Sequence, residues 1–344
     1  MAVPEAVNKN QFTPTEIWAV DDQLDQPIEQ ARYAMNTKNT AQLIGSLRQK
    51  VKRADNGVAY AVLDGDQPQE YSTTEALVYF DSLSVGPSDN RLVKAEFIRE
   101  VALFSDLNGT RDQQGKLKPV ILIASPGPGS DLRLSRQERK QVKSGDFGPA
   151  AAEYLRAVSE LGLGKIATLG FSKGSKDALA AVTMASDANL DVDRSAVGEH
   201  PGAEARKLGQ LTTAFGEAGP KELKESKART GLKAQEAALN KADMARFALG
   251  LFKPINWALV RGMQPNTFEK EVQEIFDNGR LERLVVGYGS DSAITRPTAI
   301  EPSLERLHRI YGREKLLSIK VKGGNHAWGD QLPLLAKLYM RALV

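Results

Sequence analysis

The residues with the clearest chemical potential lie in the segment LGLGKIATLGFSKGSKDALAA (161–181), where GFSKG (170–174) separates an apolar run from a helix-forming run. A glycine two positions before and two positions after Ser172 leaves room for a tight turn in which the serine backbone is strained and its hydroxyl is exposed. A hydroxyl held in this way can attack a carbonyl carbon. The pattern alone leaves a second interpretation open, an ordinary glycine-rich turn between a strand and a helix.

A serine nucleophile needs a base, and the chain has three histidines. His308 lies in a helical stretch among charged residues, which is typical of a surface or partly packed histidine. His200 follows an apolar run and could face a pocket. His326, in KVKGGNHAWGD, lies on a glycine-rich loop between the last strand-like run and the last helix-forming run. This is the place of the base when the chain order is serine, acid, histidine, so the sequence predicts His326 as the base.

The acid that orients the base is predicted from the same ordering. Asp291 directly follows the apolar run LVVGYG, and its carboxylate could accept the second imidazole N–H and fix the tautomer. The alternative for Asp291 is a loop aspartate in an Asx turn. Glu199, which follows the preceding strand-like run, is the reserve candidate, and Asp330 lies too close to His326 in the chain to be preferred. The predicted catalytic residues are therefore Ser172, Asp291 and His326.

The surrounding segments indicate how these side chains are positioned. Apolar runs without alternation, interleaved with helix-forming segments, predict an α/β fold with a mostly parallel central sheet and helices on both faces, over residues 56–202 and 281–344. Such sheets place functional residues at the carboxyl ends of their strands. Residues 203–280 have helical composition and no strand signal, so we expect an inserted helical cap. Residues 1–55 are polar and predict an N-terminal helical extension.

Three motifs in order resemble those of the α/β-hydrolase fold family. GFSKG, VVGYGSD and VKGGNHAWG resemble its nucleophile, acid and base loops, and VILIASPGPGSD resembles an early strand that ends in a glycine-rich stretch. The resemblance covers about residues 57–344 and implies the serine-nucleophile branch with a helical cap. It implies a serine hydrolase that cleaves a carboxylic ester or related acyl compound. It also implies an oxyanion hole formed by the backbone N–H groups of Lys173 and Leu83.

The chain departs from the family pattern at two places. Asp81 and Ser82 stand where the family commonly has His-Gly. A carboxylate facing a developing oxyanion would oppose its charge, so we expect Asp81 to point away or to be paired, unless the site does something other than simple acyl transfer. Lys173 is unusual beside the nucleophile. We expect its ammonium to reach solvent, and the alternatives are that it offsets Asp81 or meets an acidic substrate.

Other chemistries on the same scaffold stay open, namely thioester, amide or C–C bond cleavage and acyl transfer. A non-catalytic binding protein is a further alternative, in which residues 1–55 and the basic cap bind a partner. Some residues are candidates for a substrate pocket, and the apolar ones among them are equally typical of packing. These candidates are Ser82, Phe171, His200, Phe247, Leu251 and Trp257.

Composition narrows the remaining classes. A formal charge of +3 that is evenly spread argues against nucleic acid as the main partner, and the absence of cysteine excludes disulfides and thiolate zinc sites. No phosphate-binding Gly-Lys-Ser/Thr loop or His-x-x-x-His pair occurs, so we expect no cofactor and no metal. The N-terminus does not resemble a signal peptide, and the longest apolar stretch (244–260) is too interrupted to span a membrane. We therefore expect a cytoplasmic protein with a small-molecule acyl substrate, and a homo-oligomer stays open.

Overall fold

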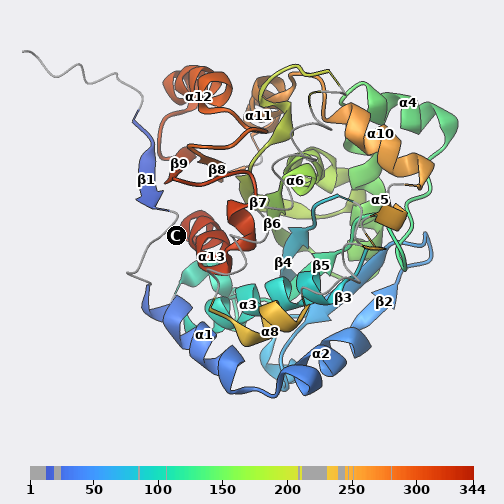
Figure 1. Ribbon diagram of the computed structural model, residues 1–344, viewed down its shortest axis with the longest axis vertical. Coiled ribbons are helices and arrows are strands. Elements are labelled where there is room, and N and C mark those ends of the chain that lie inside the picture. The colour runs from blue at the N-terminus through green and yellow to red at the C-terminus, as the bar shows by residue number, and fades with distance from the viewer. Residues whose placement is uncertain are drawn as a thin grey trace, which may run out of the picture.

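The computed structural model describes residues 13–18, 25–83, 86–105, 107–207, 210, 231–238, 245–246, 248–250, 252–279 and 281–344. These residues form one central sheet with helices packed on both of its faces (Figure 1). The predicted α/β class and the mostly parallel sheet are confirmed.

The sheet of the described residues has nine strands in the order β1-β9-β8-β7-β6-β4-β5-β3-β2. Only β3 runs antiparallel to its neighbours, β2 and β5, and all other pairs are parallel. The central strands are buried on both faces, which explains their unbroken apolar runs. The strands are β1 (Thr15–Trp18), β2 (Val51–Arg53), β3 (Ala59–Leu63), β4 (Glu75–Phe80), β5 (Val120–Ile123), β6 (Lys165–Phe171), β7 (Asp191–Gly198), β8 (Arg283–Gly289) and β9 (Leu316–Lys322).

Alternate side chains of each strand enter two separate cores. In β4, Val78 and Phe80 pack with the helices of one face, while Leu77 and Tyr79 pack with those of the other. The first core is covered by α4 (Arg136–Lys143), α5 (Gly148–Ser159), α6 (Lys173–Met184), α10 (Pro254–Gly262), α11 (Phe268–Asp277) and α12 (Pro297–Tyr311). The second is covered by α1 (Gln26–Thr37), α2 (Thr40–Gln49), α3 (Asp89–Phe104), α8 (Lys233–Ala238) and α13 (Leu332–Leu343).

The described residues among the first 55, which are 13–18 and 25–55, differ from the expected helical extension, because they also supply strands to both edges of the sheet. β1 pairs with β9, and β2 pairs with β3. The helices α1 and α2 lie outside α3 at one side of the molecule (Figure 1), and Ile28 and Leu43 enter the second core. β1, α1, α2 and β2 are therefore part of the fold, and α3 is buried along most of its length.

The described part of the insertion, residues 203–280, contains α8, α10 and α11 and no strand. These helices do not share one core. The helix α8 packs against α1, α2 and α3, whereas α10 packs against α4, and α11 packs against α6 and α12 (Figure 1). A buried hydrogen bond from Gln235 Nε2 to Asn90 Oδ1, 2.6 Å long, fixes α8 to the start of α3.

Candidate active site

Ser172 lies in the turn between β6 and α6 with φ +56° and ψ −124°, a strained conformation for a residue with a side chain. The flanking positions 170 and 174 require glycine because neighbouring backbone atoms leave no room for a Cβ atom. A Cβ on Gly170 would lie 2.1 Å from the carbonyl oxygen of Gly174, and a Cβ on Gly174 would lie 2.1 Å from that of Phe80. The Ser172 N–H donates to the Gly198 carbonyl, 2.8 Å away, which holds the turn against β7. The local geometry is that of a turn built to present a serine.

Ser172 and His326 are in contact. Ser172 Oγ lies 3.1 Å from His326 Nε2, and His326 Nδ1 lies 3.2 Å from Glu199 Oε2. Ser172 is 6% exposed and the His326 side chain is 13% exposed, so the pair is shielded from bulk water yet reaches the surface. The structure thus brings together hydroxyl, imidazole and carboxylate in one hydrogen-bonded row.

The carboxylate in this row belongs to Glu199, so the prediction of Asp291 is corrected. Asp291 is exposed, and its carboxylate accepts a hydrogen bond from its neighbour Ser290, with Oγ and Oδ1 2.7 Å apart. The strands β7 and β8 are adjacent and parallel, so both acids emerge at the same edge of the sheet. Glu199 has φ +54° at the end of β7, and this turn directs its longer side chain toward His326.

Glu199 is fully buried and is held by three further donors. Its Oε1 accepts hydrogen bonds from the backbone N–H of Gly289 at 2.6 Å and from the indole N–H of Trp328 at 2.7 Å. Its Oε2 accepts a hydrogen bond from the Ser292 hydroxyl. Two N–H groups and one hydroxyl thus donate to the two carboxylate oxygens of Glu199. The sequence interpretation missed Trp328 and Ser292, although Trp328 stands only two residues after His326.

The turn after β4 brings Asp81 and Ser82 close to the turn of Ser172. Asp81 is buried and paired, because its Oδ1 lies 3.0 Å from Arg91 Nε and accepts the Ser82 N–H at 2.6 Å. The Ser82 hydroxyl donates to the carbonyl of Phe171 at 3.3 Å. The N–H groups of Leu83 and Lys173 donate to no acceptor in the part of the chain that the structure describes. A role for them as oxyanion donors stays a prediction.

Lys173 does not reach solvent, which corrects the expectation from sequence. Its side chain is 1% exposed, and its ammonium pairs with Asp177 Oδ2 at 2.5 Å. Asp177 follows at position i+4 on α6, so the ammonium finds its partner on its own helix. The ammonium also lies 5.4 Å from the ring centroid of Tyr154. Lys173 is therefore engaged beneath the nucleophile turn.

His200 is also buried, and it faces α11. Its Nδ1 accepts the N–H of Gly202 at 3.1 Å, so the ring proton is on Nε2, which lies 2.9 Å from Glu271 Oε2. Lys176 donates to the other oxygen of Glu271 at 2.6 Å. Burial lowers the pKa of His200 despite the opposing charge of Glu271. This cluster joins α6 to α11, and a role of His200 in a substrate pocket stays a prediction.

The other pocket candidates divide as follows. Phe171 packs edge-on against Trp328, with ring centroids 5.0 Å apart, so it supports the row of catalytic candidates. Trp257 is 45% exposed on the outer surface of α10. Ser82 lies on the turn beside the nucleophile. Phe247 and Leu251 lie outside the described residues.

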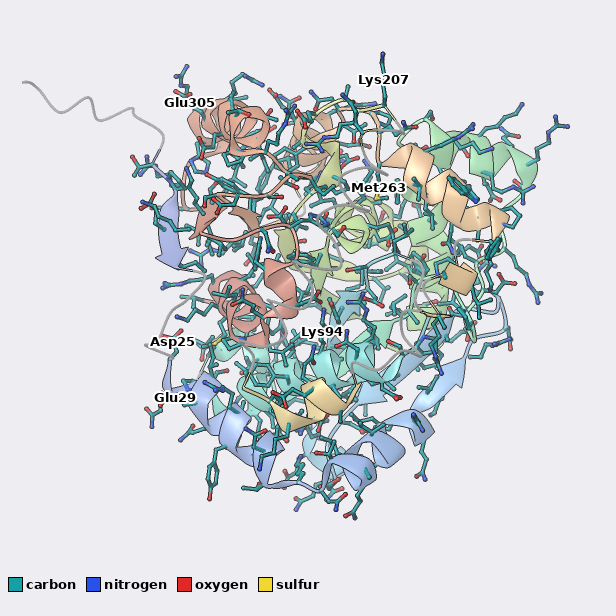
Figure 2. The ribbon with its side chains drawn as sticks, in the orientation of Figure 1. Asp25, Glu29, Lys94, Lys207, Met263 and Glu305 are labelled. Atoms are coloured by element: carbon teal, nitrogen blue, oxygen red, sulfur yellow. The ribbon has the colours of Figure 1, made fainter. Side chains whose placement is uncertain are left out.

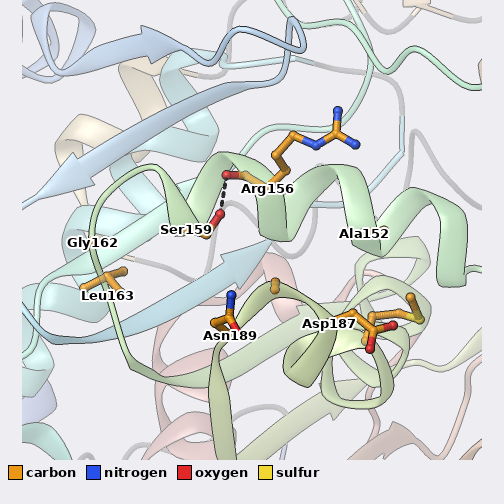
Figure 3. A pocket seen from close by; sticks show the side chains of 9 residues that line it. Ala152, Arg156, Ser159, Gly162, Leu163, Asp187 and Asn189 are labelled. Carbon is orange, nitrogen blue, oxygen red and sulfur yellow. Dashed lines mark hydrogen bonds between the residues drawn. The ribbon is translucent and has the colours of Figure 1, made fainter.

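A cavity of about 480 Å³ lies elsewhere, between the ends of α5 and α6 (Figure 3). Its lining includes Arg156, Leu163, Met184 and Asn189. Met184 is the last of the 12 residues of α6, whereas Ser172 precedes the first. An α-helix of this length spans about 18 Å, so this cavity is not the pocket of the serine.

The described residues were considered for two further features, a metal site and a membrane-spanning helix. No group of three or more His, Cys, Asp or Glu side chains there has the arrangement of a metal site. No helix in the same residues is long and apolar enough to cross a bilayer.

Comparison with known proteins identifies the fold. No family model and no curated protein sequence matches the chain. Among solved structures, the N-formylmaleamic acid deformylase of Pseudomonas putida S16 is similar with a TM-score of 0.50 and 12% identity, over 86% of this chain and 100% of the other. A carboxylesterase structure from the thaumarchaeon Nitrososphaera gargenis gives a TM-score of 0.48 and 13% identity, over 85% and 95%. With the strand order and the serine turn, the likeness to the deformylase structure establishes that the chain has the α/β-hydrolase fold, as predicted.

Proposed function

We propose that this protein is a serine hydrolase that cleaves a carboxylic ester or a related acyl compound. The single observation that carries the proposal is the hydrogen-bonded row from Ser172 Oγ through His326 to the Glu199 carboxylate. The strained serine turn supports it, because strain of about 1–3 kcal/mol is retained in a fold where the conformation serves a site.

The hydrogen bonds support a base in the correct tautomer. The Glu199 carboxylate accepts hydrogen bonds and donates none, so His326 carries its ring proton on Nδ1 and donates a hydrogen bond from it to Glu199. The lone pair on His326 Nε2 then faces the Ser172 hydroxyl. The imidazole is ready to take the serine proton at the moment of attack.

In the proposed reaction, Ser172 Oγ forms a bond to the substrate carbonyl carbon as its proton moves to His326. The carbonyl oxygen gains the negative charge, and the N–H groups of Leu83 and Lys173 receive it. The tetrahedral intermediate expels the leaving group, which takes the proton from His326, and an acyl-serine remains. Water then attacks the acyl-serine ester, with His326 again as the base. The carboxylic acid product is released and the Ser172 hydroxyl is regenerated.

The proposal also specifies the type of bond that is cleaved. One structure with a similar fold is named as a deformylase of an N-formyl compound, so cleavage of an N-acyl bond is the second candidate reaction. A panel of p-nitrophenyl esters, acyl thioesters and acyl anilides, each assayed with wild type and Ser172→Ala, separates these bonds. We expect ester turnover that Ser172→Ala abolishes. A folded wild type that turns over nothing in the panel would contradict the proposal and favour a binding protein.

A further inference from the structure

Four charged side chains, two of them buried and two mostly buried, connect the turn of the proposed oxyanion donors to the loop of His326. Asp81 lies on the turn after β4, and Arg91 and Lys94 lie on α3. Asp330 lies in the short 3-10 helix Trp328–Asp330 that follows His326. None of the four side chains is more than 13% exposed. We call them the α3 charge cluster.

One arm of the α3 charge cluster shapes the oxyanion turn. Asp81 Oδ1 accepts the Ser82 N–H at 2.6 Å and lies 3.0 Å from Arg91 Nε. The Ser82 N–H is therefore occupied, and the next N–H along the turn, that of Leu83, is the one left to meet a ligand. The Asp81 carboxylate thus orients the turn, although its charge lies close to where an oxyanion would form.

The other arm reaches the loop of the base. Lys94 pairs with Asp330, and Arg91 Nη1 lies 3.9 Å from the same carboxylate oxygen. The Asp330 N–H donates to the carbonyl of Ala327 at 2.9 Å, next to His326. Lys94 lies among the side chains in the interior, whereas Asp25 and Glu29 lie at the outline of the molecule (Figure 2). Two cations and two anions balance, which is the condition for burying charges without large loss of stability.

We infer that Arg91 is a positioning residue for this site: it neutralises Asp81 and ties the oxyanion turn, through Asp330, to the loop of His326. The inference rests on the proposed function. Without the guanidinium, Asp81 would be an unpaired charge in a low-dielectric region and would oppose the negative charge that develops on the substrate oxygen. A neutral ester carries no such charge before the reaction, so the effect falls on kcat and not on KM.

The test compares Arg91→Met, Asp81→Asn and the double variant on one p-nitrophenyl ester. Arg91→Met is expected to lower kcat about 10²-fold, the size of a lost oxyanion donor, with KM little changed. The amide in Asp81→Asn can still accept the Ser82 N–H but carries no charge. The double variant is therefore expected to regain at least about tenfold in kcat over Arg91→Met, a coupling that additive structural damage would not give.

Lys38→Met is the matched control, because Lys38 pairs with another buried charged residue of the same helix, Glu100, with the charged atoms 2.7 Å apart. It is expected to lower the melting temperature and leave kcat unchanged. A double variant as slow as Arg91→Met, or an equal loss of kcat in Lys38→Met, would overturn the inference. If Arg91→Met does not fold, the double variant carries the test, and a kcat below about 1% of wild type overturns it. An inert wild type would overturn the proposed function as well, whereas an active wild type without recovery would overturn this inference alone.

Discussion

The substitution Glu199→Gln separates the two carboxylates that could orient His326. The Oε1 position of Glu199 receives two N–H donors, from Gly289 and Trp328. The new amide must place its oxygen there, because the flipped arrangement would leave two buried donors without an acceptor, at about 1–3 kcal/mol each. Its NH₂ group then faces His326 Nδ1 and donates to it. The ring proton is forced onto Nε2, where it blocks transfer from Ser172.

A wrong tautomer of this kind costs about 10⁴-fold in kcat in serine proteases, or about 5.5 kcal/mol of activation free energy. We expect a loss of this size for Glu199→Gln, measured as kcat on the best ester of the panel, with circular dichroism to check the fold. Asp291→Asn is the control and is expected to stay within about twofold of wild type, as an exposed substitution away from the site should. A Glu199→Gln protein with more than a tenth of the wild-type kcat, or a hundredfold loss in Asp291→Asn, would refute the reasoning.

Three further outcomes follow from the contacts. Trp328→Phe removes one N–H donor to the buried Glu199 carboxylate and should lower kcat about tenfold, since such bonds contribute about 1.5–3 kcal/mol; unchanged kcat would contradict this. Gly174→Ala would place a Cβ 2.1 Å from a β4 carbonyl oxygen and should abolish folded protein, whereas Gly45→Ala, with open space around it in α2, should keep or raise the melting temperature. Burial lowers the pKa of His308 to about 4, so between about pH 6.5 and 4 the unfolded chain binds a proton that the folded chain does not, and the free energy of unfolding falls as pH falls. In His308→Gln the melting temperature should therefore depend less on pH over this range. A pH dependence equal to that of the wild type would contradict this prediction.

The strained turn at Ser172 could be predicted because its determinants are local. The clashes that require glycine at 170 and 174 involve atoms within the turn and the adjacent strand. His326 could be predicted because the chain has only three histidines and one of them follows the last strand. Chain order and residue type were sufficient for both.

The acid could not be predicted because its identity depends on a backbone dihedral. Glu199 and Asp291 each follow a strand of the same edge, and the positive φ of Glu199 decides which carboxylate reaches His326. The ion-pair partner of Lys173 could have been predicted from the sequence, since Asp177 stands four residues later on a helix. The strand β1 could not have been predicted, because it pairs with β9 about 300 residues away and is too short to show a hydrophobic pattern of its own.

The central claim is that Ser172 is a nucleophile activated by His326. Its most direct test is reaction with a fluorophosphonate probe, read by intact mass and by mapping of the labelled peptide. One adduct is predicted, located on Ser172, absent from Ser172→Ala and formed much more slowly in His326→Ala. A folded wild-type protein that takes up no probe, or an adduct that persists in Ser172→Ala, would contradict it.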